Sequence, residues 1–433
     1  MSKKLTLEEK LARRKFHRPN RFLYDFLCHF VVFPFLEPKY NVHYQYVDKI
    51  KKEKGPCFLI FNHQSRIDYV WAIRSAYPKR LNFVVGYNEF LRSHLHFILK
   101  IANVIPKKNF TLDMPAMRGI DTIIKKKGVI AFSPEGMSSI SGHNQPVVSA
   151  TGKLFKHYGI PVYILKSKGA FLTNTKVCLD ERKGRIDCTL SKLFTPEDLA
   201  KLTPEEIDLK TNEALWQDDY EWNLKENIPY KNNGNLAYHM PDLLYRCPKC
   251  GKEFTMVDEG NKLYCSSCGN GAILDDTYKM HPLHEGDKLP STPSRWFDEE
   301  RKEVYREIKN NPDFAFEFDA KIGMLPKYSF LKDMKTSELV GEGRVRIDHH
   351  GFHYKGNRNN DYFSFDLDYR NLPTLGMPTD TSYFSLYYDG DYYDIMPKTP
   401  VVGKVLLIVE EMHRLHENTW KNFPWMDWVY QED

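Results

Sequence analysis

A histidine and an aspartate five residues apart have the types and spacing of a general base and its orienting carboxylate. His63 and Asp68 lie in the segment NHQSRID (residues 62–68), which follows a short apolar run, Cys57 to Phe61. The apolar run predicts a buried strand, and Asp68 opens a segment whose apolar positions recur at helical spacing. The loop between them can fold back so that the carboxylate meets one imidazole nitrogen. The other nitrogen is then free to take a proton from a substrate hydroxyl, without a Ser or Cys nucleophile.

A pair with this spacing also arises by chance, and the histidine is then an ordinary loop residue hydrogen-bonded by a carboxylate. A second segment, FSPEGMSS at residues 132–139, favours the chemical interpretation. It follows another apolar run, Gly128 to Phe132, which predicts a buried strand about one strand–helix–strand unit downstream. The two segments together, more than either alone, indicate an active site.

The two segments resemble motifs of the glycerolipid acyltransferase family, which contains the lysophosphatidic acid acyltransferases. The first motif of that family is N-H-x-x-x-x-D, which Asn62, His63 and Asp68 match here. The third is P-E-G followed by Thr or Ser, and the segment at 134–138 is similar to it. Residues 159–162, GIPV, look like the strand entry of the fourth motif. The resemblance extends from about Phe22 to Trp222, roughly half of the chain.

This resemblance implies transfer of an acyl group from a thioester, on coenzyme A or acyl carrier protein, to the hydroxyl of a lysophospholipid. His63 is expected to take the hydroxyl proton, Asp68 to orient His63, and backbone amides to receive the oxyanion. Glu135 and Gly136 are expected to shape the acceptor site. The first choice of acceptor is 1-acylglycerol 3-phosphate, which would give phosphatidic acid. Glycerol 3-phosphate and other lysophospholipids remain alternatives.

The cations that would hold an acceptor phosphate depart from the family pattern. Where members often carry an Arg in a second motif, this chain has IPKK at 105–108, so Lys107 or Lys108 is expected to supply the charge as a point charge. Ser133 replaces the usual Phe, and Met137-Ser138 replaces the usual Thr-Arg, so a second expected cation is missing. Three other residues are candidates to compensate for it: Arg66, Lys166 and Lys168.

Four of the eight cysteines have the spacing of a metal site. They form C-x2-C, fourteen residues, C-x2-C, and each pair is followed by Gly: Cys247, Cys250, Cys265 and Cys268. Two such knuckles supply four thiolates to a tetrahedral ion, which predicts a structural zinc ribbon with no open position for chemistry. Two disulfides or an iron–sulfur site are the alternatives, but disulfides need an oxidising compartment and no secretory signal is evident. The remaining cysteines are expected to be buried thiols.

The amino-terminal 36 residues combine charge with apolar character. Residues 1–21 hold eight Lys or Arg, and Phe22 to Leu36 is the longest apolar run, at fifteen residues. A membrane span needs about 20 apolar residues, and no cleavage site for a signal peptide follows. The pattern fits a basic, amphipathic segment that lies in the membrane interface. The family resemblance implies that this segment lies at the cytoplasmic face of a membrane, with peripheral or monotopic attachment. The alternative is a core helix that follows a solvated basic stretch.

Alternating strand and helix patterns over residues 37–235 predict an α/β sheet covered by helices on both faces. Within that sheet, Lys176 to Leu179 and Arg185 to Leu190 are expected to form a hairpin. The zinc ribbon spans 244–274, and a linker and a helix occupy 275–313. From 314 to 433 the pattern changes to short alternating strands and one helix, in an order that resembles pleckstrin-homology-like or GRAM-like domains. The aromatic tail, with Trp420, Trp425 and Trp428, is expected to pack on this domain.

Composition and charge narrow the functional classes. With 433 residues, 42% hydrophobic and 27% charged, the chain is expected to form two or three globular domains. The net charge of +5 is modest and the ribbon is not markedly basic, so no nucleic-acid partner is expected. A protein of another class remains possible: a catalytically inactive, lipid-binding scaffold with a zinc ribbon. Retention of His63, Asp68, Glu135 and Gly136 together argues for an enzyme.

Overall fold

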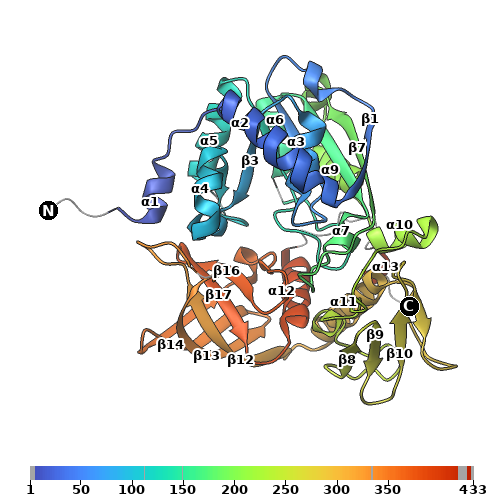
Figure 1. The fold of residues 1–433 in the computed structure, drawn as a ribbon. Helices are drawn as coiled ribbons and strands as arrows, with labels where there is room; N and C mark the ends of the chain where they lie inside the picture. The colour runs from blue at the N-terminus through green and yellow to red at the C-terminus, as the bar shows by residue number, and fades with distance from the viewer. Residues whose placement is uncertain (1–4, 112, 149, 333–334, 418–426, 431–433) are drawn as a thin grey trace.

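The computed structural model describes residues 5–111, 113–148, 150–332, 335–417 and 427–430 of the chain. Three sheets organise these residues: a seven-stranded sheet with helices, and below it in Figure 1 a six-stranded and a four-stranded sheet. The arrangement confirms the predicted fold class. An α/β sheet covered by helices is followed by a small antiparallel sheet with four clustered cysteines, then by an antiparallel half-barrel packed against a carboxyl-terminal helix.

The seven-stranded sheet has the order β1-β7-β6-β2-β5-β3-β4, and all of its neighbouring strands are parallel except β6 and β7. Its central strand, β2, has five buried residues in a row, because helices cover both of its faces. The strands are β1 (Asn41–Tyr46), β2 (Cys57–Phe61), β3 (Leu81–Gly86), β4 (Ile105–Lys107), β5 (Val129–Phe132), β6 (Val162–Lys168) and β7 (Arg185–Phe194).

Helices pack on both faces of this sheet. On one face, η1 and α3 contribute Val32 and Trp71 to an apolar cluster with the strands, and on the other α5, α6 and α9 contribute Ile120, Phe155 and Ile207. The helices of this half are α1 (Leu7–Ala12), α2 (Arg21–Leu27), η1 (Cys28–Leu36), η2 (Glu37–Lys39), η3 (Ile50–Lys52), α3 (Asp68–Ala76), η4 (Tyr87–Leu91), α4 (Ser93–Ile101), α5 (Met114–Lys125), α6 (Thr151–Tyr158), α7 (Ala170–Thr173), α8 (Pro196–Lys201), α9 (Pro204–Leu215) and α10 (Asp219–Glu226).

The predicted hairpin at 176–190 is wrong. Residues 174–184 contain no strand, and β7 instead pairs antiparallel with β6 and parallel with β1. The carbonyls of Cys178 and Leu179 accept hydrogen bonds from the Arg66 guanidinium, so side-chain donors satisfy this backbone in place of a strand partner. Local alternation of residue types carries no information about such a distant donor.

The amino-terminal apolar run forms α2, which continues into the π-helical η1. Tyr24, Cys28 and Val32 face the protein and are buried. A row of aromatic side chains on the same helices is exposed to solvent: Phe22, Phe26, Phe30 and Phe35. The helix is therefore apolar where it faces the core and also over most of its exposed surface. Among the described residues, no helix combines the length and the apolar character that crossing a membrane requires.

The small sheet carries the four cysteines. It has the order β11-β10-β9-β8 and is antiparallel throughout. Its strands are β8 (Met256–Glu259), β9 (Lys262–Cys265), β10 (Gly271–Leu274) and β11 (Met280–Pro282), and the short η5 (Met240–Asp242) precedes them.

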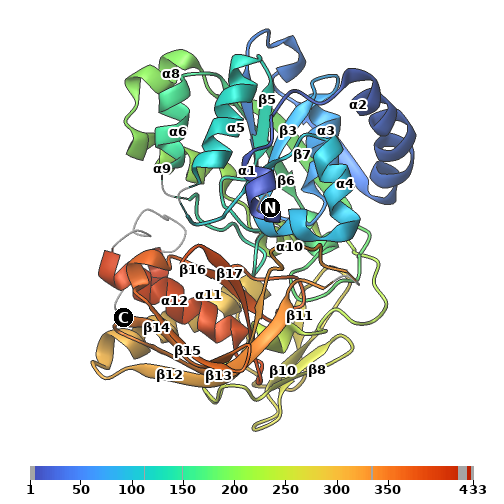
Figure 2. The ribbon, with the colours of Figure 1, turned by 90° about the vertical axis from the view of Figure 1, so that its left-hand side faces the viewer.

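The carboxyl-terminal sheet is a curled, antiparallel half-barrel of order β15-β14-β13-β12-β17-β16. The helices α11 and α12 pack against each other and against this sheet (Figure 2). Its elements are α11 (Pro293–Asn310), β12 (Ala315–Met324), β13 (Glu338–Asp348), β14 (Gly351–Arg358), β15 (Asp361–Leu367), η6 (Tyr369–Asn371), β16 (Phe384–Tyr388), β17 (Asp391–Pro397), α12 (Val402–Glu417) and α13 (Asp427–Tyr430).

The aromatic tail is described in part. Trp420 and Trp425 lie outside the described residues, as does the side chain of Trp428. The neighbouring Tyr430 packs on this half of the molecule: its hydroxyl donates to Glu411 Oε1 at 3.0 Å, and the Arg414 guanidinium lies 3.5 Å from its ring centroid.

One apolar cluster joins helices and loops of the first half to the small sheet and the half-barrel. It contains Phe171 and Leu172 from the first half, Leu263 from the small sheet, and Phe352 and Leu406 from the half-barrel and its helix. The division of the chain at 1–36, 37–235, 244–274, 275–313 and 314–433 remains a prediction. The shared core indicates that these parts fold as a joined body.

Candidate active site and metal centre

His63 and Asp68 meet at the carboxyl end of β2. His63 Nδ1 lies 2.9 Å from Asp68 Oδ2, and the histidine side chain is 32% exposed whereas the aspartate side chain is 1% exposed. Ser65 N–H and Trp71 Nε1–H also donate to Asp68, at 3.0 and 3.1 Å. Burial raises the pKa of Asp68, against the opposing effect of the hydrogen bond from His63.

This arrangement fixes the imidazole. With Asp68 accepting at Nδ1, the ring carries its proton there and presents Nε2 as an acceptor. Among the described residues, Nε2 has no hydrogen-bond partner. The geometry therefore suits a general base that faces the accessible side of the site.

Glu135 lies behind His63. Its Oε1 accepts from the backbone N–H of His63 and from Asn144 Nδ2, both at 2.9 Å, and its Oε2 accepts from Gln145 N–H at 3.0 Å. Burial raises the pKa of Glu135 to about 7, although the donor from His63 opposes the shift. Ser139 N–H donates to the His63 carbonyl at 2.7 Å, so residues of the segment 132–139 hold the backbone of His63 from both sides. These contacts favour a positioning role for Glu135, and its predicted part in acceptor binding stays a prediction.

The turn at Gly136 needs glycine. Its φ is +77°, and an added Cβ would lie 3.1 Å from both Phe110 and Val148. The Gly136 carbonyl accepts from Asn109 Nδ2 at 2.8 Å, which ties the turn to the loop after β4. Asn62, at the end of β2, exchanges hydrogen bonds with the backbone of Ser167 on β6 at 2.8 Å in both directions. Together with the contact between Glu135 and His63, these links bring the ends of β2, β4, β5 and β6 together at the carboxyl end of the sheet.

The lysines predicted for the acceptor phosphate make contacts within the protein. Lys107 Nζ donates to the carbonyls of Lys108 and Thr111, and burial lowers its pKa. Lys108 Nζ pairs with Glu8 at 2.7 Å and donates to the Gly390 carbonyl at 3.1 Å, so it bridges α1 and the half-barrel. Their assignment to the acceptor stays a prediction.

The compensating cations also have defined places. Arg66 is committed to the 174–179 segment, where its Nη2 donates to Asn174 Oδ1 at 3.0 Å and to the Leu179 carbonyl at 2.9 Å. Lys166 and Lys168 lie at the end of β6 beside β2. Burial lowers the pKa of Lys166 to about 8, and repulsion from Lys168 acts in the same direction.

Lys176 is a cation that the sequence did not identify. It is 6% exposed, and its Nζ donates to Ser138 Oγ at 2.9 Å, two residues beyond Gly136. Burial, together with repulsion from Arg66, lowers the pKa of Lys176 to about 7, and attraction by Asp380 opposes both effects. Lys176 makes no ion pair within the described residues. A single Lys in the run TKVCL gives no sequence signal that it returns to the P-E-G turn.

The four cysteines of the ribbon form one cluster. Their Sγ atoms all lie within 4.8 Å of one another, with Cys247 and Cys268 at 3.6 Å and Cys250 and Cys265 at 3.8 Å. Zinc–sulfur bonds of about 2.3 Å place tetrahedral sulfurs about 3.8 Å apart, so the cluster fits one zinc ion. Each knuckle turns at a glycine with positive φ, +70° at position 251 and +75° at position 269. The four residues form a possible structural zinc site.

Comparison with solved structures gives partial structural matches. No protein-family model matches the chain, and no curated protein matches its sequence. Part of the fold is similar to the crystal structure of the 1-acyl-sn-glycerophosphate (LPA) acyltransferase PlsC from Thermotoga maritima, at 15% identity and a TM-score of 0.35. The match covers 41% of this chain and 69% of that chain. A similarity of this size does not establish a shared activity, so the functional argument rests on side-chain geometry.

Proposed function

We propose that this protein is an O-acyltransferase that moves an acyl group from a thioester to the hydroxyl of a lysophospholipid. The observation that carries the proposal is the 2.9 Å contact between His63 Nδ1 and the buried Asp68 carboxylate, with the rest of the ring accessible. The residue pattern around this pair supports the same reaction, because the buried Glu135 holds the backbone that presents His63.

In the proposed reaction, His63 Nε2 takes the proton of the acceptor hydroxyl as its oxygen attacks the thioester carbonyl. Asp68 stabilises the imidazolium that results. The carbon–sulfur bond then breaks as the tetrahedral intermediate collapses, and the imidazolium proton passes to the leaving thiolate. The products are an ester and a free thiol, on coenzyme A or acyl carrier protein, so protons and electrons balance without a redox partner.

The proposed acceptor is 1-acylglycerol 3-phosphate, with phosphatidic acid as product. Lys176 supports an anionic acceptor, because a buried ammonium with one neutral hydrogen-bond partner is stabilised when an anion enters. It supplies, from another segment, a charge beside Ser138 of the P-E-G turn. Glycerol 3-phosphate and other lysophospholipids carry phosphate too and remain alternatives.

A membrane-associated location is part of the proposal. The exposed row of Phe22, Phe26, Phe30 and Phe35 on α2 and η1 offers an apolar face to the lipid interface, where the acceptor resides. The zinc ribbon is proposed as structural, with Cys247, Cys250, Cys265 and Cys268 as its ligands. The half-barrel is proposed as pleckstrin-homology-like, with no ligand assigned to it.

The test is an assay of the purified protein with a panel of lysolipids and acyl thioesters, with the products read by mass spectrometry. His63→Ala should lower kcat about a thousandfold. Asp68→Asn should lower kcat about a hundredfold. An amide has only one acceptor oxygen, so its NH2 group would face either the Trp71 N–H or the donors of His63 and Ser65, and the imidazole would lose its orientation. His157→Ala, at an exposed histidine on α6, is the matched control and should change nothing.

Melting temperatures of the variants should match the parent within a few degrees, so that loss of rate is not loss of fold. Normal turnover by His63→Ala would contradict the mechanism. No product from any thioester and acceptor would favour the other class, a catalytically inactive lipid-binding scaffold.

A further inference from the structure

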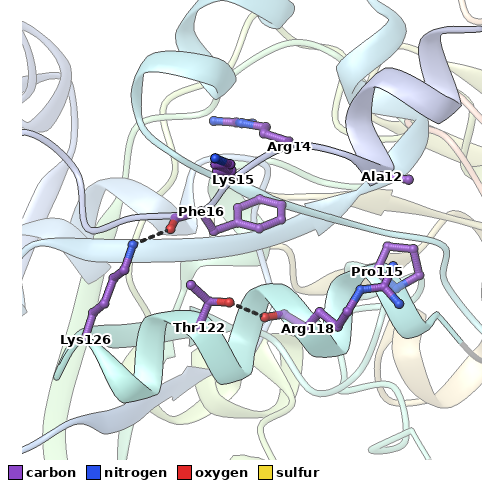
Figure 3. A pocket seen from close by; sticks show the side chains of 8 residues that line it. All are labelled: Ala12, Arg14, Lys15, Phe16, Pro115, Arg118, Thr122 and Lys126. Carbon is purple, nitrogen blue, oxygen red and sulfur yellow. Dashed lines mark hydrogen bonds between the residues drawn. The ribbon is translucent and has the colours of Figure 1, made fainter. Parts of the chain in front are cut away.

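A groove outside the candidate active site is lined by four cations. It lies between the amino-terminal segment and α5 and has a volume of about 380 Å³. Figure 3 shows Arg14 and Lys15 on the side of the amino-terminal segment and Arg118 and Lys126 on the side of α5. No acidic side chain lines the groove among the described residues.

The charges of this groove are not neutralised by the protein. None of the four cations makes an ion pair within the part of the chain that the structure describes. On the same helix, by contrast, Lys125 pairs with Asp121 at 2.7 Å. Four cations that share one groove without a carboxylate repel one another, and an anion that enters relieves this repulsion.

The wall formed by the amino-terminal segment is held in place. Arg14 donates to the carbonyls of Lys100 at 2.6 Å and Val104 at 3.3 Å, and Lys126 Nζ donates to the Phe16 carbonyl at 2.9 Å. Phe16 is buried against α5 where the helix has glycine: a Cβ at Gly119 would lie 3.2 Å from the Phe16 ring. Hydrogen bonds and packing therefore fix the wall of the groove that the amino-terminal segment forms.

We infer that this groove binds a phosphate ester that carries at least two negative charges. Guanidinium and ammonium groups together match the charge and the oxygen geometry of phosphates. The volume admits more than a bare phosphate ion, and Phe16 and Pro115 add apolar surface.

Two sources provide this chemistry. One is the nucleotide end of a coenzyme A thioester, and this source rests on the proposed acyl transfer. The loop before α5 contacts the candidate active site through Asn109 and Gly136, and the groove begins at Pro115, so a long donor can follow α5 away from His63. The other source is the headgroup of an anionic phospholipid, which does not depend on the reaction.

The test uses the full chain and measures binding, not turnover. Titration calorimetry with adenosine 3′,5′-bisphosphate probes the nucleotide source, and flotation with vesicles of phosphatidylcholine, with and without phosphatidic acid, probes the lipid source. The variant Lys15→Gln/Arg118→Gln removes two groove charges whose side chains make no hydrogen bond in the described structure. The charge-matched control, Arg13→Gln/Lys125→Gln, removes two charges from the same segments outside the groove.

The groove variant should bind at least one probe about tenfold more weakly than the control, because loss of each charge-assisted contact weakens anion binding. Loss for the bisphosphate alone assigns the groove to the acyl donor, and loss for anionic vesicles alone assigns it to a headgroup. If the intact protein binds neither probe, or if the groove variant and the control bind both equally, the inference is wrong. Because no arm needs catalysis, failure of the proposed acyltransferase activity would be seen separately.

Discussion

At the scale of single residues, the ionisation of Lys176 has a consequence for acceptor binding. Its pKa, lowered to about 7 chiefly by burial, is far below the ordinary lysine value of 10.5. Above about pH 7, Lys176 is therefore largely neutral in the free protein, and binding of a phosphate there requires that Lys176 takes up a proton. Below that pH the charge is already present. If Lys176 meets the acceptor phosphate, acceptor affinity must decline as the pH rises.

The Lys176 prediction is a pH-dependent KM. In the parent protein, the KM for 1-acylglycerol 3-phosphate should rise as the pH increases above about 7. Lys176→Arg keeps its charge at every pH, so its KM should be nearly flat over the same range. Lys176→Met should raise KM roughly tenfold to a hundredfold at pH 6.5. The measurement is initial-rate kinetics between pH 6 and 9 at saturating thioester.

Lys183→Met is the matched control for this prediction, because Lys183 is exposed in the same loop. An identical pH profile in the parent and in Lys176→Arg would remove Lys176 from acceptor binding. The KM for the thioester should be the same in all variants, since that substrate contacts other residues.

The sequence predicted some residue contacts and missed others for a physical reason. His63 and Asp68 could be paired because both lie within one short loop between a strand and a helix. The role of Glu135 behind the His63 backbone and the approach of Lys176 to Ser138 depend on which strand ends become neighbours. That information is spread over the whole sheet, so no local pattern carries it.

At the scale of elements, the four-cysteine sheet is expected to depend on metal. Elemental analysis of the purified protein should find one zinc per chain. Cys250→Ser should lose the ion and lower the melting temperature by roughly 5 °C, since metal binding at a four-thiolate site is part of the folding free energy. Cys28→Ser, at a cysteine outside the cluster, should keep the full zinc content.

Loss of zinc from the small sheet should also weaken its contacts with the first half of the chain. Tyr278, which follows β10, donates through its hydroxyl to the Leu172 carbonyl at 2.8 Å, and Arg182 Nη1 lies 3.2 Å from the same hydroxyl. A zinc-free Cys250→Ser protein with an unchanged melting temperature would show that the ribbon is held by its packing alone.

The sequence largely predicted which segments form helices and strands, but it did not predict which strands pair with one another. The apolar run from Cys57 to Phe61 forms the buried strand β2, as its composition predicts. The helix α11 is capped by Thr292, whose hydroxyl accepts from Arg295 N–H at 3.1 Å. Ser294, two residues later, carries a hydroxyl that is chemically equivalent as a cap, so only the path of the chain decides between the two residues.

At the scale of the whole molecule, buried polar contacts join the two halves in addition to the shared apolar core. His143, in the segment between β5 and α6, pairs through Nε2 with Asp298 of α11 at 2.7 Å, and both side chains are buried. In the loop before β16, Asp380 N–H donates to the carbonyl of Lys176 at 3.0 Å. The half-barrel therefore contacts the segment that carries the buried cation of the candidate site.

The His143–Asp298 pair predicts how stability depends on pH. Burial alone would lower the pKa of His143, but attraction by Asp298 and Asp218 outweighs it and raises the pKa to about 9. Because the folded-state pKa exceeds that of the unfolded chain, the stabilisation is fully present below about pH 6.5 and is lost as the pH rises through about 9. The shift corresponds to about 3 kcal/mol at low pH.

Asp298→Asn removes the carboxylate, so its unfolding free energy should fall below that of the parent by about 3 kcal/mol at pH 6, and the difference should shrink by pH 9.5. Chemical denaturation of both proteins across this range measures the difference between their unfolding free energies. Other titrating groups, such as Lys176, contribute equally to both proteins, so their pH dependence cancels in this difference. The control is Asp313→Asn, at an exposed aspartate just after α11, and it should show no such trend. If the difference in unfolding free energy stays constant from pH 6 to 9.5, His143 is neutral in the folded protein. The contact between His143 and Asp298 is then a hydrogen bond from a neutral imidazole.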